Sequence, residues 1–312
     1  MSLVEKALQK LQKEREAAGA QPTAELSAPA AYREAPVRRE VPVPPRAEPS
    51  LRPDPVLEDH GATTPGIPPM HRREVRIDAR ALRAAGILPP ELQARVVGDQ
   101  FRHIKRPLLA GALGRGGAAV PNGRLIMVGS ALQGDGKTFS CLNLALSLAL
   151  EHDVSVLLVD ADVVRPQLTR LLNLEGAPGI LDALTDFEMH PLEVVSLTDT
   201  PGLEFVAAGR RKDNMSESLA SRRLDEILSE WLAATANRIV LFDTPPLLVT
   251  NEARVLAGKV GQVLLVVRED ATPQSAVKDA LRLVRTGSSV SLILNDSRAG
   301  GASGYYGYNY GD

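Results

Sequence analysis

Cysteines, long apolar runs and an excess of one charge are all missing from this sequence, and each absence excludes a class of protein. The single cysteine, Cys141, rules out an internal disulfide framework and fits a reducing compartment. No apolar run approaches the roughly 20 residues that span a bilayer, and the N-terminus lacks the apolar core of a secretory signal. A formal net charge of −2 gives no reason to expect a nucleic-acid partner. We therefore predict a cytoplasmic protein that would reach a membrane only through a partner or a surface contact.

Aromatic residues are few and unevenly placed. The chain has five tyrosines, and four of them lie among its last eight residues. Glycines between them give the backbone wide conformational freedom, and no apolar period indicates a packed element. We predict that this tail presents its tyrosines to something that reads or modifies them: Tyr305, Tyr306, Tyr308 and Tyr310.

Composition divides the chain into four regions. Residues 1–19 carry apolar side chains at helical spacing, which predicts an amphipathic helix that either docks on a partner or stands alone. Residues 20–72 hold 12 of the 23 prolines and are predicted to be a disordered linker. A folded domain with a helical lead-in is predicted over 73–294, and a flexible tyrosine-rich tail over 295–312.

The pattern of the central region predicts an α/β fold. Helical spacing covers Ala79–Ala85 and Pro90–Lys105, and the glycines from Gly111 to Gly117 are expected to form a connector. From Arg124 onward, apolar strand-like runs alternate with helical patterns, which favours a doubly wound, mostly parallel sheet of the P-loop NTPase type. The expected strands are Leu125–Val128, Val154–Val159, Leu203–Ala207, Ile239–Phe242, Val263–Val267 and Val290–Leu294.

A phosphate-binding loop follows the first of these strands. The segment from Ser130 to Thr138 ends in Gly-x-Gly-Lys-Thr and differs from the P-loop pattern only by Ala131 at the first glycine position. Its backbone N–H groups and the following helix N-terminus can bind the phosphates of ATP. Lys137 is predicted to reach the β- and γ-phosphates, and the Thr138 hydroxyl to bind Mg²⁺. The predicted nucleotide-binding residues are Gln133, Gly134, Asp135, Gly136, Lys137, Thr138, Phe139 and Arg165, although Arg165 could equally contact a neighbouring subunit or lie on the surface.

Two later strands deliver carboxylates to the same edge of the sheet. Asp160 and Asp162 leave one strand, and Asp243 leaves another in a Walker-B-like arrangement. Phosphoryl transfer needs metal-held phosphates, charge neutralisation and an aligned nucleophile. Lys137, Thr138, Asp162 and Asp243 can supply the first two, which leaves Asp160 to orient or deprotonate an incoming hydroxyl. The sequence does not decide which of Asp160 and Asp162 binds the metal.

These motifs resemble those of the bacterial tyrosine kinases over roughly residues 90–312. The segment Asp160–Pro166 resembles the family's second aspartate motif, Asp243–Pro246 its Walker B, and the tail its tyrosine cluster. Asp99–Lys105 is similar to the family's Glu-x-x-Arg-x-x-Arg oligomerisation motif, with Asp99 and Lys105 replacing its first and last residues. Asn214–Leu219 resembles a family loop, and Met1–Leu8 resembles the subgroup encoded with exosortase-type exopolysaccharide systems.

The resemblance implies an enzyme that uses ATP and Mg²⁺ to phosphorylate its own C-terminal tyrosines and regulates exopolysaccharide synthesis or export. It also implies a homo-oligomer, a membrane chain-length determinant (polysaccharide co-polymerase) as partner, which would recruit the chain to the membrane, and a cognate phosphatase. The alternative is a partition or cell-division ATPase of the same P-loop class. Those proteins carry a signature lysine where this chain has Leu132. A third reading, a non-catalytic adaptor, is disfavoured by the intact Lys137.

Overall fold

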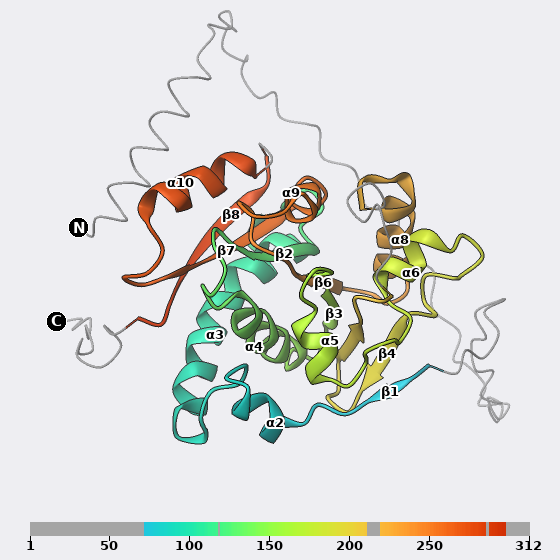
Figure 1. Ribbon diagram of the computed structural model, residues 1–312, viewed down its shortest axis with the longest axis horizontal. Coiled ribbons are helices and arrows are strands. Elements are labelled where there is room, and N and C mark those ends of the chain that lie inside the picture. The colour runs from blue at the N-terminus through green and yellow to red at the C-terminus, as the bar shows by residue number, and fades with distance from the viewer. Residues whose placement is uncertain (1–71, 118, 211–218, 285–286, 298–312) are drawn as a thin grey trace, which may run out of the picture. The chain divides into compact units, whose positions relative to one another are not determined.

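The computed structural model describes residues 72–117, 119–210, 219–284 and 287–297 (Figure 1). The predicted N-terminal helix, almost all of the predicted linker, and the tail from residue 298 onward lie outside these ranges. Residues 214–218 of the loop that resembles a family motif lie outside them as well. None of the helices in the described part of the chain is long and apolar enough to cross a membrane.

Eight strands form one sheet, in the order β1-β4-β5-β3-β6-β2-β7-β8. Every neighbouring pair is parallel except β4 with β5, so the predicted mostly parallel sheet is confirmed. Short β1 and β4 were not expected, because runs of two and four residues carry little period-2 signal. The strands are β1 (Glu74–Val75), β2 (Leu125–Ser130), β3 (Ser155–Asp160), β4 (Val195–Thr198), β5 (Leu203–Val206), β6 (Arg238–Asp243), β7 (Gln262–Arg268) and β8 (Ser289–Asn295).

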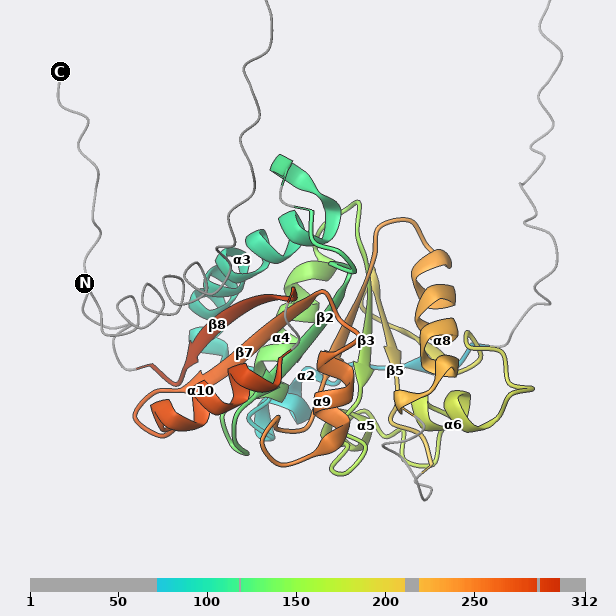
Figure 2. The same ribbon diagram turned by 90° about the horizontal axis from the view of Figure 1, so that it is seen from above.

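Helices cover both faces of the sheet (Figures 1 and 2). Alternate strand residues enter two separate apolar cores: Ile126 packs with α2 to α5, and Met127 packs with α6 to α10. The central strands β2, β3 and β6 are therefore buried almost throughout, as a doubly covered sheet requires. The helices are α2 (Ala79–Ala84), α3 (Glu91–Leu113), α4 (Lys137–Ala149), α5 (Gln167–Leu171), α6 (Ile180–Thr185), α8 (Arg222–Ala233), α9 (Asn251–Ala257) and α10 (Gln274–Leu283).

Helix α3 is longer than its sequence pattern indicates. It continues through Pro107 and Gly111 and ends at Gly114, which has a left-handed φ of 67°. Gly111 is a packing position here, because a Cβ on it would lie 2.8 Å from the Gln262 side-chain oxygen Oε1. The expected glycine connector therefore begins later, in the short 3₁₀ turn Arg115–Gly117.

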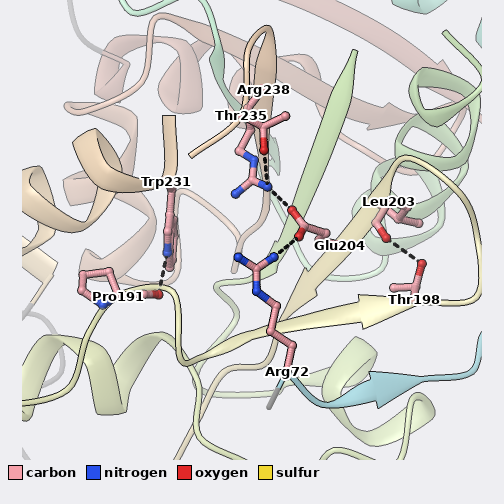
Figure 3. Close-up of polar contacts among 8 residues, drawn as sticks. All are labelled: Arg72, Pro191, Thr198, Leu203, Glu204, Trp231, Thr235 and Arg238. Carbon is pink, nitrogen blue, oxygen red and sulfur yellow. Dashed lines mark hydrogen bonds and ion pairs between the residues drawn. The ribbon is translucent and has the colours of Figure 1, made fainter. Parts of the chain in front are cut away.

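The segment that leads into the domain is fastened to the outer part of the sheet. The backbone N–H of Leu197 donates to the carbonyl of Arg73 at 2.8 Å. The Arg72 side chain donates to Glu204 of β5 at 2.9 Å. Arg238, buried at the start of β6, also donates to Glu204, so two arginines share one carboxylate (Figure 3). This triad holds the lead-in segment against β4 and β5.

Strand register brings the predicted site residues together at the carboxyl edge of the sheet. Asp160 at the end of β3 lies opposite Asp243 at the end of β6. Val128 of β2 pairs with Asp243 on its other side, two residues before Ser130. A doubly wound sheet binds its ligands at this edge, so the topology alone gathers the three motifs.

Candidate active site

The loop between β2 and α4 has the geometry of a phosphate cradle. Gly134 and Gly136 adopt left-handed φ values of 87° and 92°, which residues other than glycine rarely adopt. Ser130 at the start of the loop donates its hydroxyl to the Leu132 carbonyl at 2.6 Å. Helix α4 then begins at Lys137, so its first N–H groups face the loop. The predicted loop-then-helix arrangement is what the structure contains.

A pocket of about 350 Å³ opens beside this loop. Its floor carries Lys137, Thr138 and Asp162, and Gln133, Gly134, Gly136, Phe139 and Arg165 also line it. These are eight of the sequence-predicted site residues. Three surface segments close the remaining sides: the end of β3 with the start of α5, the turn after β6, and the turn between α2 and α3. The turn after β6 continues the predicted Walker-B-like segment Asp243–Pro246, whereas the turn between α2 and α3 was not predicted to take part.

Lys137 and Asp162 form the charged centre of the pocket. The Lys137 ammonium lies 3.7 Å from an Asp162 carboxylate oxygen, and both side chains are nearly buried. Burial raises the pKa of Asp162, while its hydrogen bond from the Arg165 backbone N–H, at 3.0 Å, and the nearby cations Lys137 and Arg165 act to lower it. The arrangement places one cation and one carboxylate together in the pocket beside the phosphate loop.

Asp160 lies behind the pocket wall and not in the pocket. It is fully buried, and its Oδ2 atom accepts hydrogen bonds from both the backbone N–H and the hydroxyl of Thr169, each at 2.8 Å. The expectation that Asp160 orients or deprotonates an incoming hydroxyl stays a prediction, with its Oδ2 atom already bonded to Thr169. The sequence could not show this, because Thr169 folds back from α5, nine residues after the aspartate it holds.

Asp243 has the surroundings of a cation ligand. It is buried, and among the described residues neither of its carboxylate oxygens has a hydrogen-bond partner within normal geometry; the same holds for Oδ1 of Asp160. Desolvation, with the adjacent Asp160 charge, raises the pKa of Asp243 to about 8 against the opposing effects of Lys137 and Thr138. Desolvation also raises the pKa of Asp160 to about 7. Buried carboxylates with free oxygens are expected to take up protons or a cation.

The residues present fit Mg²⁺ on condition that phosphates share its coordination. The Thr138 side chain lies beside Asp243, and Thr138 and Asp162 both line the pocket. Among the described residues, no group of three or more His, Cys, Asp or Glu side chains could hold a metal ion. Mg²⁺ commonly binds through one or two carboxylates plus substrate phosphates and water, which suits this donor set.

Asp135 stabilises the phosphate loop through hydrogen bonds within the protein. Its carboxylate accepts hydrogen bonds from the Leu132 backbone N–H at 3.0 Å and from the Thr272 hydroxyl at 2.7 Å. Its backbone carbonyl accepts from the Asn295 side chain at 2.9 Å. The Asp135 side chain is thus occupied within the protein, and only its backbone is left for a nucleotide. Asn295, expected to start the tail, is instead the last residue of β8.

The segment that resembles an oligomerisation motif uses its lysine inside the domain. The Lys105 ammonium donates to the Ser147 carbonyl at 2.6 Å and pairs with Glu151 at 2.7 Å, and its side chain is almost fully buried. Arg102 is exposed and pairs with Asp99 on the same helix at 2.7 Å. Arg102 and Asp99 are therefore the members of this motif left at the surface.

Curated relatives of this chain are tyrosine-protein kinases. Tyrosine-protein kinase YwqD of Bacillus subtilis is 30% identical over 186 residues, which is 58% of this chain and 77% of that protein. Putative tyrosine-protein kinase AmsA of Erwinia amylovora is 32% identical over 185 residues. This chain spans only about a quarter of the length of AmsA. No family model matches the chain.

Solved structures give the same fold. The kinase domain of VpsO aligns with a TM-score of 0.54 and 27% identity, covering 66% of this chain and 98% of that one. The kinase domain of the Escherichia coli tyrosine kinase ETK aligns with a TM-score of 0.51 and 29% identity, covering 60% of this chain and 72% of that one.

Proposed function

Because the chain belongs to the bacterial tyrosine-protein kinases, we propose that it transfers the γ-phosphoryl group of ATP to tyrosines of its own C-terminal tail. The pairing of Lys137 with Asp162 in a pocket beside the phosphate loop carries this proposal. The acceptors would be Tyr305, Tyr306, Tyr308 and Tyr310, which lie outside the described residues.

The described side chains supply the functions that phosphoryl transfer needs. Lys137 would neutralise charge on the transferring group, and the N–H groups of the phosphate loop would hold the phosphates in place. Thr138 and Asp243 would hold Mg²⁺, which would supply positive charge to offset that of the phosphates. In the transfer step, the tyrosine oxygen forms a bond to the γ-phosphorus. The bond between the γ-phosphorus and the β–γ bridging oxygen breaks, and ADP leaves.

The phenolic proton needs an acceptor, because an unperturbed tyrosine has a pKa of about 10. Asp162 lines the pocket, whereas Asp160 does not, so we assign the proton-accepting role to Asp162. Asp160 then acts through its neighbours: it adds charge beside Asp243 and is fixed by Thr169.

A switch ATPase of the partition type is the alternative, and two observations disfavour it. The loop has Leu132 at the position of the signature lysine, and the curated relatives are named tyrosine kinases. We further propose that the protein is cytoplasmic and oligomeric, and that it regulates exopolysaccharide synthesis or export. A membrane co-polymerase would be its partner, and a cognate phosphatase would reverse its action.

Incubation of the purified chain with Mg·ATP, followed by phosphosite mapping, tests the proposal. Phosphate is expected on tyrosines 305–310 of the wild-type chain and not on Lys137→Met alone. Tyrosines that stay unmodified, even with the cytoplasmic segment of a co-polymerase partner present, would refute kinase activity. A mixture of Lys137→Met with an active chain whose tail is deleted separates the two routes, because label on Lys137→Met requires transfer between subunits.

A further inference from the structure

The geometry points to a binding site for the acceptor tyrosine ring, built from the turn between α2 and α3 and the turn after β6. This inference rests on the proposed kinase function and extends it to the turn between α2 and α3, which lies outside the nucleotide motifs, and to Val249, which lies just beyond the Walker-B-like segment. Ile87 of the α2–α3 turn forms one apolar wall of the pocket, and Pro246 and Val249 of the turn after β6 form a second. Ile87 and Pro246 are largely buried, so Val249 gives most of the exposed apolar surface. Together with the charged floor at Lys137 and Asp162, these walls make a slot that suits an aromatic ring carrying a reactive hydroxyl at its far end.

The turn between α2 and α3 is held rigidly against the helix of the phosphate loop. The N–H groups of Ile87 and Leu88 both donate to the Leu82 carbonyl, at 2.9 and 3.2 Å. The Asn143 side chain of α4 donates to the Ile87 carbonyl at 3.0 Å and to the Phe139 carbonyl at 2.7 Å. One buried amide therefore ties this turn to the first turns of α4, so the wall and the nucleotide site keep a fixed spacing.

The opposite wall is fixed just as firmly. The Leu247 N–H donates to the Ser130 carbonyl at 2.9 Å, and the Thr244 hydroxyl donates to the Val128 carbonyl at 3.0 Å. These bonds join the turn after β6 to the strand that ends in the phosphate loop. Val249, at the outer end of the turn, keeps 64% of its surface exposed although it is apolar. An exposed valine on a rigid pocket rim offers apolar surface to a ligand at little cost in ordering.

The slot shares its pocket with Asp162, the residue proposed to accept the tyrosine proton. Its walls join the ends of β3 and β6, where Asp162 and Pro245 stand, and the α2–α3 turn. On its other side, the loop is occupied by contacts with Thr272 and Asn295. The nucleophile in phosphoryl transfer lies in line with the leaving group, beyond the γ-phosphate. Asp162, the proposed proton acceptor, lines the slot together with its apolar walls, which favours the acceptor as its occupant over the nucleobase.

The tail of this chain, or of a second copy, supplies the aromatic ring. Asn295 lies 2.9 Å from the Asp135 carbonyl, so the sequence that ends in the tyrosines begins beside the phosphate loop. Tyr305 follows ten residues later, a span of at most about 35 Å. Tyrosines buried at binding sites contribute chiefly through their apolar faces while the hydroxyl stays free to react or hydrogen bond. Apolar walls of this kind would favour tyrosine over Ser303 of the same tail.

Val249→Ser tests the slot, with Val96→Ser as its matched control. Val96 lies on α3 outside the pocket, and with 58% of its surface exposed it resembles Val249. Full-length chains are compared by three measurements: the initial rate of tail phosphorylation, kinetics on an added peptide of residues 303–312, and the Kd of a fluorescent ATP analogue. Val249→Ser is expected to raise the KM for the peptide three- to tenfold with kcat and the nucleotide Kd within twofold. Val96→Ser is expected to change none of them by more than twofold.

Each other outcome has a definite meaning. If the wild type phosphorylates its tail and Val249→Ser has an unchanged peptide KM, the acceptor slot is refuted while the kinase function stands. If Val249→Ser weakens binding of the ATP analogue and leaves the peptide KM unchanged, the walls bind the nucleotide, and the inference is again refuted. A wild type that transfers no phosphate to tyrosine refutes the proposed function itself. Ile87→Val, which removes one methyl group from the other wall, is expected to raise the peptide KM in the same direction.

Discussion

Replacing Glu204 by alanine should destabilise the whole domain, because it removes the one carboxylate that Arg72 and Arg238 share (Figure 3). Arg238 has only 2% of its surface exposed, and its Nε and Nη1 atoms have no hydrogen-bond partner. Burial lowers the pKa of Arg238, and Glu204 acts against this shift. Without Glu204, a buried guanidinium would keep its charge with only the Thr235 hydroxyl, 3.0 Å away, as partner.

Removing one partner of a buried ion pair typically costs about 3–5 kcal/mol in the free energy of unfolding, since the remaining charge is left uncompensated. Glu204 has 13% of its side chain exposed and Arg72 has 30%, so solvent screens part of the triad. We therefore expect the low end of that range, about 3 kcal/mol. Replacing both Glu204 and Arg238, as Glu204→Leu with Arg238→Met, should recover most of the loss.

Trp231 is a suitable probe for this measurement. It is the only tryptophan, is fully buried, and donates its indole N–H to the Pro191 carbonyl at 2.9 Å (Figure 3). Urea titration followed by its fluorescence gives the free energy of unfolding of each variant. Glu175→Ala is the control, because Glu175 pairs with Arg170 at the exposed surface and should matter by less than about 1 kcal/mol. A Glu204→Ala chain within about 1 kcal/mol of the wild type would refute the reasoning.

Three further predictions concern the active site. Thr169→Val removes the hydroxyl that donates to Asp160 and accepts from the Ala208 N–H. The kcat should therefore fall with little change in the nucleotide Kd, and an unchanged kcat would contradict this. Gly136→Ala forces alanine to adopt a left-handed φ and places its Cβ 1.9 Å from the Asn295 Nδ2 atom. Binding of a fluorescent ATP analogue should therefore weaken at least tenfold, and binding within twofold of wild type would count against this prediction. Without metal or nucleotide, the free energy of unfolding should fall as pH rises from 5 to 8. The pKa values of Asp160 and Asp243 are raised to about 7 and 8, so over this range the folded state holds protons that the unfolded state has released. Urea titrations across this pH range check the slope, which Asp243→Asn should reduce; a wild-type slope of the opposite sign would show that the two carboxylates are already ionised.

The sequence predicted the sheet and most of its strands because β2, β3 and β6 are continuous apolar runs with a clear length. It predicted the phosphate loop because local spacing alone specifies that motif. It did not predict β1, which pairs with β4, or β4, which pairs with both β1 and β5. The end of α3 was also missed, because Gly111 reads as a helix breaker until its contact with Gln262 is known.

The candidate site divides in the same way. Lys137, Thr138, Asp162 and Arg165 were predicted from their motifs, and the structure gathers them around one pocket. Nothing in the sequence linked this pocket to Ile87, because that turn lies about 50 residues before the phosphate loop and meets it through Asn143.

By itself the sequence determined the chemistry available to this protein: a lysine and hydroxyl on a phosphate loop, three strand-end carboxylates, and a tail with four tyrosines. Short-range spacing is enough for those assignments, because each motif is a few consecutive residues at the end of a strand. Only the tertiary structure decided how the carboxylates divide. It buried Asp160 against Thr169, left Asp162 in the pocket, and set Asp243 beside Asp160 without hydrogen-bond partners. Exposure and hydrogen bonding arise from packing between distant segments, and these properties distinguish Asp160 from Asp162, which the sequence alone could not tell apart as metal ligands.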